Sequence, residues 1–300
     1  MDIELKAFLE RAETLMRRVE PLLPMPREVI DWRVTFAARW QRDARGGWLL
    51  PLRVNLDLSL DDLIGVDRQR DLLAANTRQF VAGLPANHVL LWGARGTGKS
   101  SLIRALLAEY AEAGLRLIEI ERDHLADLPR LVEVLAGQQH AFVVFCDDLS
   151  FEAGEGDYRV LKSVLDGSLE RAPENVLLYA TSNRRHLVPE RQSDNENWQM
   201  VDGELHPNEA VEDKIALSDR FGLWLSFYPF SQEHYLRVVQ HWIGSLARRV
   251  ELVWTWDEAL EKEAIRWATS RGNRNGRCAY QFARQWVGVR LLQTQASRAD

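Results

Sequence analysis

The stretch from Gly93 to Ser100 constrains the fold more than any other part of the sequence, because it fits the pattern G-x-x-x-x-G-K-[ST]. A strand-like apolar stretch precedes it at 88–92, and the apolar spacing of a helix begins at Lys99. Glycines let backbone N–H groups turn around phosphate oxygens, and the N-terminus of a helix adds a partial positive charge. The pattern therefore predicts a phosphate-binding loop between a strand and a helix.

The residue types of this loop match the groups of a nucleoside triphosphate. Lys99 is expected to reach the β- and γ-phosphates, and Ser100 to ligate Mg²⁺, so the implied cofactors are ATP and Mg²⁺. The predicted nucleotide contacts in this stretch are Gly93, Ala94, Arg95, Gly96, Thr97, Gly98, Lys99, Ser100 and Ser101.

Strand-like and helix-like stretches alternate around the loop. The strand-like stretches are 88–92, 116–121, 141–146, 176–180 and 223–228, and the helix-like stretches begin at 99 and cover 125–136 and 158–170. Strands that alternate with helices predict a parallel sheet covered on both faces, so the expected fold class is α/β with a three-layer α/β/α core.

Polar residues follow two of these strands. Asp147 and Asp148 come directly after 141–146, and a Thr-Ser-Asn sequence ending at Asn183 follows 176–180. Because the carboxyl ends of parallel strands face the same crevice, we expect Asp147 to help hold Mg²⁺ and Asp148 to orient or deprotonate the attacking water. The alternative for the acidic pair is a turn cap, and a turn is the default role of Thr-Ser-Asn.

The composition excludes several other classes of protein. Of 300 residues, 46% are hydrophobic and 27% charged, as in soluble globular proteins, and the net charge of −6 argues against an overall basic nucleic-acid binder. Cys146 and Cys278 are far apart and form no zinc or disulfide pattern. The acidic N-terminus lacks a signal peptide's basic region, and no apolar run approaches the roughly 18 residues of a membrane span. We therefore expect a cytoplasmic protein without membrane contact.

Charge is unevenly distributed along the chain. The stretch 264–299 has seven arginines and no acid, so the rest of the chain carries −13, whereas 190–213 has eight acids and one base and predicts a solvated loop. The arginines alternate with aromatic residues, which fits either a packed helical segment with phosphate and intersubunit contacts or a nucleic-acid surface. We favour the first, because an acidic protein has little nonspecific attraction for nucleic acid.

The N-terminal part of the chain gives fewer indications. Apolar spacing predicts an amphipathic helix over 5–23, which packs on its own domain or binds a partner. The stretch 32–52 has three tryptophans and a Gly-Gly turn, and it indicates no chemistry.

The order of these motifs resembles that of the AAA+ ATPases, over about residues 55–289. The likeness rests on the phosphate loop, the acidic and polar strand ends, Ser218–Gly222 and Gly276–Arg277. A more specific likeness, to the bacterial domain-of-unknown-function 815 family, rests on the stretches 60–67, 89–93, 145–152, 179–187 and 217–223.

This resemblance implies a nucleotide held between an α/β core at 55–230 and a small helical lid at 231–300, after an N-terminal segment at 1–54. Ile64 and Gly65 would then lie in the segment that packs on the adenine. Neighbouring subunits would complete each site, so the resemblance also implies a homo-oligomer.

Three further residues match positions of the family. Asn183 matches the first sensor, Arg220 the arginine finger that reaches the neighbour's nucleotide, and Arg277 the second sensor in the lid. Arg184 and Arg185 are alternative candidates for the contact with the neighbour. The plainer alternatives are an internal ion pair for Arg220 and a surface position at a helix start for Arg277.

The chain departs from the family pattern at the end of the acidic strand. Many members have Asp-Glu there, whereas this chain has Asp147-Asp148. Aspartate is one methylene shorter than glutamate, so the attacking water would sit closer, or Glu152 would serve as the base.

The sequence thus predicts an ATP-hydrolysing oligomer that couples the nucleotide cycle to remodelling or loading of an unidentified macromolecular partner. The alternative is a slow nucleotide-dependent switch in which hydrolysis is incidental. A small-molecule phosphotransferase shares the loop but does not need Arg220 or Arg277.

Overall fold

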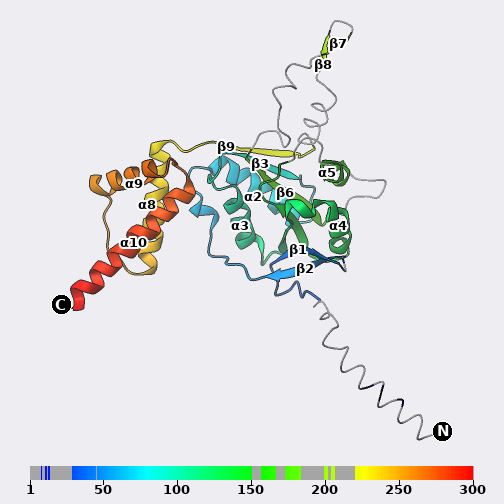
Figure 1. Cartoon of the computed structure of the whole chain (residues 1–300), viewed down its shortest axis with the longest axis horizontal. Coiled ribbons are helices and arrows are strands. Elements are labelled where there is room, and N and C mark those ends of the chain that lie inside the picture. Colours follow the sequence, from blue (N-terminus) through cyan, green and yellow to red (C-terminus); the bar gives the residue numbers. More distant parts are fainter. Residues whose placement is uncertain are drawn as a thin grey trace. The chain divides into compact units, whose positions relative to one another are not determined.

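A seven-stranded sheet carries the phosphate loop (Figure 1). Its strand order is β2-β1-β4-β5-β6-β3-β9. The computed structural model describes residues 8, 11, 13, 29–44, 46–150, 157–166, 173–183, 199–201, 204–206 and 220–299. The strands of the sheet are β1 (Ala37–Asp43), β2 (Gly46–Leu52), β3 (Val89–Gly93), β4 (Leu115–Glu119), β5 (Ala141–Cys146), β6 (Val176–Ser182) and β9 (Leu223–Phe227).

The sheet is parallel except at one edge. The strands from β1 to β9 in the spatial order pair in parallel, and only β2 runs antiparallel, beside β1. Every residue of β6 is buried. Because successive side chains point to opposite faces of a strand, this burial means that both faces of the sheet are covered. The predicted α/β class with a mostly parallel, doubly covered sheet is confirmed.

Helices and 3₁₀ turns connect the strands, as crossovers between parallel strands require. They are η2 (Leu60–Asp62), α2 (Asp67–Val81), α3 (Lys99–Tyr110), η3 (Arg122–Asp127), α4 (Leu128–Ala136) and α5 (Asp157–Asp166). A central hydrophobic cluster, which includes Leu73, Leu91, Leu106, Val143 and Tyr179, joins α2 and α3 to the sheet.

A buried polar cluster fixes α2 against the sheet beside the loop. The Tyr179 hydroxyl lies 3.0 Å from Thr77 Oγ1 and accepts from Asn76 Nδ2 at 3.1 Å. Asn76 also exchanges two hydrogen bonds with the backbone of Asn87, just before β3. Buried polar groups with satisfied partners specify one arrangement, so this cluster positions the start of the strand that leads into the phosphate loop.

The sheet begins earlier in the chain than the boundary at residue 54 implies. Residues 37–52 form the β1–β2 hairpin, and β1 pairs with β4, so these residues belong to the sheet. Trp40 is buried, and its indole N–H donates to Asp127 Oδ2 at 3.2 Å. A Cβ at Gly47 would lie 1.9 Å from the Trp40 ring, which explains the glycine. This tight packing is a contact in space that the pattern of residues 32–52 does not reveal.

Three helices follow the last strand, and together they are called the lid here. They are α8 (Gln232–Arg249), α9 (Glu258–Ser270) and α10 (Gly276–Ala299). Side chains of Ser231 and Asp257 cap the N-termini of α8 and α9. The lid has its own hydrophobic cluster, which includes Tyr235, Ile243, Leu260, Phe282 and Val287. None of the described helices combines the length and the apolar character that a bilayer crossing requires.

Two predicted segments are described only in part. Of the expected helix at 5–23, Phe8, Arg11 and Glu13 are helical and the other residues lie outside the described part of the chain. Residues 1–31 form a unit separate from 32–300. Within the predicted acidic loop at 190–213, β7 (Gln199–Val201) and β8 (Glu204–His206) pair as a short antiparallel hairpin, and the rest lies outside the described residues.

His88 makes the stability of this sheet depend on pH. Its Nδ1 accepts a hydrogen bond from the Leu178 backbone N–H at 3.0 Å, and burial lowers its pKa from 6.5 to about 4. The unfolded chain therefore binds a proton that the folded chain does not between these pH values. The free energy of unfolding should therefore be highest above pH 6.5. It should decrease as the pH is lowered toward 4, by up to about 3 kcal/mol.

Urea unfolding across this pH range checks the assignment, with His88→Asn as the comparison. The asparagine amide oxygen can accept the same hydrogen bond but cannot titrate. The variant should therefore lose less stability on acidification than the wild type does. The same pH dependence in both proteins would contradict the assignment of this effect to His88.

Candidate functional site

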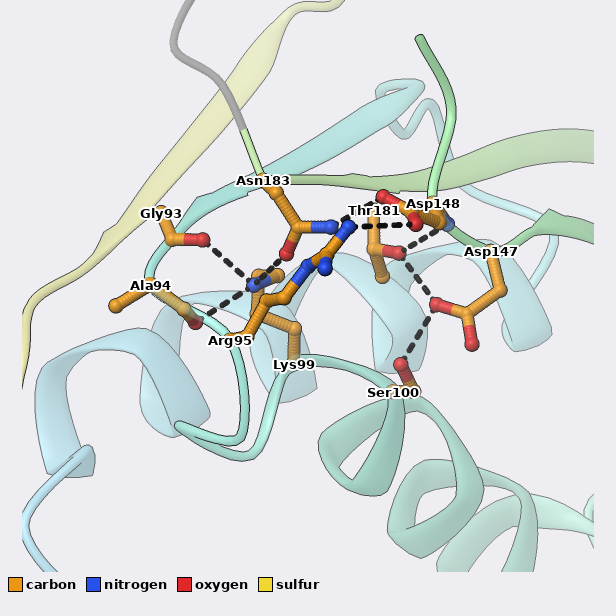
Figure 2. Close-up of polar contacts among 9 residues, drawn as sticks. All are labelled: Gly93, Ala94, Arg95, Lys99, Ser100, Asp147, Asp148, Thr181 and Asn183. Carbon is orange, nitrogen blue, oxygen red and sulfur yellow. Dashed lines mark hydrogen bonds and ion pairs between the residues drawn. The ribbon is translucent and has the colours of Figure 1, made fainter. Parts of the chain in front are cut away.

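The strand order brings three strand ends together beside the phosphate loop. β6 lies between β3 and β5, so the ends of these strands are adjacent at one edge of the sheet (Figure 2). The β3 end continues into the loop, the β5 end carries Asp147 and Asp148, and the β6 end carries Thr181 and Asn183. Residues far apart in the sequence therefore form one polar cluster.

Glycines shape the loop. Gly93, Gly96 and Gly98 have φ values of +128°, +75° and +102°, a region that side chains with a Cβ rarely adopt. A Cβ at Gly93 would also lie 2.0 Å from the Phe227 carbonyl oxygen of β9. Gly98 is the N-cap of α3, so the loop passes directly into the helix N-terminus. This is the backbone geometry that the sequence pattern predicted.

Lys99 lies inside the loop rather than in solvent. Its Nζ donates to the carbonyl oxygens of Gly93 and Ala94 at 2.8 Å each, and to Asn183 Oδ1 at 3.4 Å. The residue is 7% exposed. Burial lowers the pKa of Lys99, and the carboxylates of Asp147 and Asp148 oppose that shift. The site thus holds a desolvated cation at the position that the sequence assigned to the phosphates.

Asp147 is held by two hydroxyl groups. Ser100 Oγ donates to Asp147 Oδ1 at 2.7 Å, and Thr181 Oγ1 donates to the same oxygen at 2.5 Å. These groups are all oxygen donors, the type that Mg²⁺ prefers. The described residues contain no cluster of three or more His, Cys, Asp or Glu side chains placed to hold a metal. The donor set therefore suits an ion that keeps waters and phosphate oxygens as its other ligands.

Asp148 points away from Asp147, toward the loop (Figure 2). Its φ is +55°, a conformation that aspartate tolerates better than most residues. Its carboxylate accepts a hydrogen bond from Asn183 Nδ2 and forms an ion pair with Arg95, whose Nη2 is 3.5 Å away. The side chains of Arg95 and Asp148 are 78% and 57% exposed, so this ion pair contributes little to stability. The two adjacent acids thus face different partners.

A cavity of about 700 Å³ extends from this cluster to the lid. The site residues expected from the sequence that line it are Ile64, Arg95, Gly96, Thr97, Gly98, Lys99, Ser100, Ser101, Asp147, Asp148, Asn183 and Arg277. Gly93 and Ala94 contribute the carbonyls that bind Lys99. Gly65 packs against the lid, where a Cβ would lie 2.2 Å from the His234 ring.

The lid contributes lining residues that the sequence reading did not assign. They are Val238, Trp242 and Tyr280; Phe230, just before α8, also lines the cavity, and the core adds Asp62 and Arg104. Trp242 and Tyr280 meet edge to face, with ring centroids 4.8 Å apart. Their helical spacing indicates only a packed face, so nothing in the sequence separates them from ordinary core aromatics.

Hydrogen bonds connect the lid to both sides of the cavity. The Gly276 N–H donates to the Gly96 carbonyl oxygen at 2.8 Å, at the tip of the phosphate loop. On the other side, His234 Nε2 lies 2.8 Å from the Ile64 carbonyl oxygen, and His241 Nε2 lies 2.8 Å from Asp62 Oδ1. A change in the position of the lid would therefore alter hydrogen bonds at both ends of the cavity.

Arg220 lies apart from this cluster. Arg220 is partly buried just before β9 and is not among the described residues that line the cavity. Glu152 lies outside the described residues, as do Arg184 and Arg185.

Comparison with known proteins gives a family and a fold. The family model for a protein of unknown function (DUF815) matches residues 33–290. The search of curated proteins found no match.

Many solved structures share the fold, including one of RuvB and one of ORC1. A point mutant of RuvB from Thermotoga maritima is 18% identical, with a TM-score of 0.52, and the match covers 82% of this chain and 68% of RuvB. The Aeropyrum pernix ORC1 protein in complex with DNA is 15% identical, with a TM-score of 0.51. That match covers 78% of this chain and 65% of ORC1, just under two thirds of its length. The chain therefore belongs to the DUF815 family and has the fold of the AAA+ P-loop ATPases.

Proposed function

We propose that this chain binds MgATP in the cavity between the strand ends and the lid, and hydrolyses it in an oligomer that remodels or loads a macromolecular partner. The observation that carries the proposal is the convergence of Lys99, Ser100, Asp147, Asp148 and Asn183 at one end of a cavity that the lid closes at the other. The cavity volume of about 700 Å³ suits a ligand of nucleotide size.

The loop and Lys99 would bind the phosphates. The backbone N–H groups of the loop and the N-terminus of α3 offer hydrogen bonds and partial positive charge to phosphate oxygens. Lys99 would exchange its two carbonyl partners for oxygens of the β- and γ-phosphates. A buried ammonium group makes stronger electrostatic interactions than an exposed one, so these contacts would contribute most of the phosphate affinity.

Ser100 and Asp147 would hold Mg²⁺, with Thr181 fixing the Asp147 carboxylate. When bound, the ion would neutralise charge on the phosphates. Asp148 would accept the proton of the attacking water, while Asn183 orients that water by hydrogen bonds. Arg95 and Asn183 engage the Asp148 carboxylate, and its 57% exposed side chain still has acceptor sites for the attacking water.

The adenine base of ATP would lie at the lid end of the cavity. Leu63 and Ile64 of the core line the cavity, and so do Trp242 and Tyr280 of the lid. Apolar and aromatic surfaces of this kind favour a flat nucleobase. Arg277, at the start of α10, lines the same cavity and would carry lid movements to the phosphates.

Arg220 would act on the nucleotide of a neighbouring subunit. An arginine supplied by a neighbour stabilises the charge of the transferring phosphoryl group, and its position outside its own cavity fits such a role. The partner that the oligomer acts on is a macromolecule. The ORC1 structure that shares the fold contains DNA, but the net charge of −6 makes nucleic acid the less favoured partner here.

A second candidate is a slow nucleotide-dependent switch with incidental hydrolysis. The observation that favours it is the engagement of Asp148, the shorter acid, by both Arg95 and Asn183. A base held in this way would deprotonate water slowly, and the bound nucleotide would then act mainly on the lid.

The first test is Lys99→Ala. Loss of two charge-assisted contacts to phosphate should weaken ATP binding on the order of 100-fold. Isothermal titration with a non-hydrolysable ATP analogue measures this, and Lys262→Ala, which removes an exposed lysine of α9 paired with Glu258, is the matched control. Unchanged affinity in a folded Lys99→Ala protein would contradict the site assignment.

The second test is Arg220→Ala. This variant should bind ATP normally and hydrolyse it about 1000-fold more slowly, because only the transition state uses the arginine. Mixing it with Lys99→Ala should restore part of the activity, since an intact Lys99 site can then receive Arg220 from its neighbour. Phosphate release from each variant alone and from the mixture is the measurement. A mixture no more active than its components would contradict the role between subunits.

A further inference from the structure

The lid has a second cavity, separate from the nucleotide cavity. It has a volume of about 400 Å³ and lies between α9 and α10. It shares no lining residue with the first cavity among the described residues. Nothing in the proposed ATPase mechanism uses it.

The cavity combines an apolar floor with an unsatisfied donor. Phe282 and Trp286 are buried at its base, and Val289 is exposed at its edge. Trp267 also lines it, and the indole Nε1–H of Trp267 is buried without a hydrogen-bond partner in the described part of the chain. A buried donor without an acceptor is costly, so a ligand that shifts the Trp267 ring and brings an oxygen to its N–H would gain a hydrogen bond that the free protein lacks.

Positive charge predominates around this floor, where two arginines and one acid among the described residues line the cavity. Arg266 and Arg290 line the cavity, and they belong to the stretch 264–299, which has seven arginines and no acid. Arg271 lies 4.1 Å above the Trp267 ring, and Arg290 lies 5.2 Å above the Trp286 ring. The charge complement of this surface is a ligand with carboxylates.

Two features favour a peptide over a nucleic-acid strand. One face of Trp267 and one face of Trp286 are already covered by Arg271 and Arg290, which leaves less aromatic surface for stacked bases. The cavity is also lined by the acceptor Glu263 and by the side-chain amides of Gln285 and Gln293. A peptide backbone has both donors and acceptors to match these groups, whereas a phosphodiester backbone has acceptors alone.

We propose that the cavity between α9 and α10 binds a short segment of a partner protein that carries an apolar side chain next to acidic residues. The apolar side chain packs against Phe282, and a peptide oxygen accepts from the Trp267 indole N–H once that ring shifts. The flanking carboxylates pair with Arg266 and Arg290. This site does not depend on ATP hydrolysis, so its failure and that of the ATPase proposal are distinguishable.

The test begins with selection of binders from a random-peptide display library on the full chain. The selected peptides should share an apolar residue flanked by Asp or Glu. Fluorescence anisotropy then measures the affinity of the most enriched peptide for Arg266→Gln/Arg290→Gln. Loss of two charged contacts should weaken binding about tenfold or more. The matched control is Arg237→Gln/Arg248→Gln, which removes the same charge from exposed positions on α8 and should bind as the wild type does.

A second readout follows the donor itself. The ¹H–¹⁵N signal of the Trp267 indole, identified by its absence in Trp267→Phe, should move when the peptide is added. Selection of peptides without acids, no selection at all, or equal losses in both double variants would overturn the proposal. A labelled single-stranded oligonucleotide that binds the wild type and the control, but not Arg266→Gln/Arg290→Gln, would overturn it in favour of nucleic acid.

Discussion

The hydroxyl of Thr181 is the contact on which the arrangement of the site depends. It donates to Asp147 Oδ1 and accepts from the Asp148 backbone N–H, so one side chain of β6 fixes both acids at the end of β5. The Leu149 N–H also donates to the Thr181 carbonyl oxygen, which holds the chain as it leaves the strand. This contact exists because β6 lies between β5 and β3. Asp147 can then face Ser100 while Asp148 faces Arg95 and Asn183.

The same geometry links chemistry to movement of the lid. The loop that would bind the phosphates accepts a hydrogen bond from Gly276, and the segment on the other side of the cavity is bonded to α8. A ligand that fills the cavity contacts both parts at once. Its binding energy can therefore favour one lid position, provided that it differs between positions. In the proposed function, this coupling would transmit the nucleotide state to the partner that is remodelled. The cavity between α9 and α10 offers a place for such a partner to bind.

The sequence predicts the site better than its surroundings, for physical reasons. The local backbone conformation requires glycine at positions 93, 96 and 98, so a short sequence pattern is enough to predict the loop. The acids at 147 and 148 follow a strand that can be recognised by its run of apolar residues. The β1–β2 hairpin depends on Gly47 packing against Trp40 and on pairing with β4, far along the chain. Trp242 and Tyr280 line the cavity only because the lid folds over the core. Contacts of this kind leave no local pattern.

We propose that MgATP is hydrolysed at sites that neighbouring chains complete. The most direct measurement is the rate of phosphate release per chain, with Mg²⁺ present, over a wide range of protein concentration. We expect a rate per chain that rises with concentration and then levels off as the chains become fully oligomeric, because an isolated chain lacks its neighbour's Arg220. A rate per chain that is the same at every concentration, although the chain moves from monomer to oligomer, would contradict it.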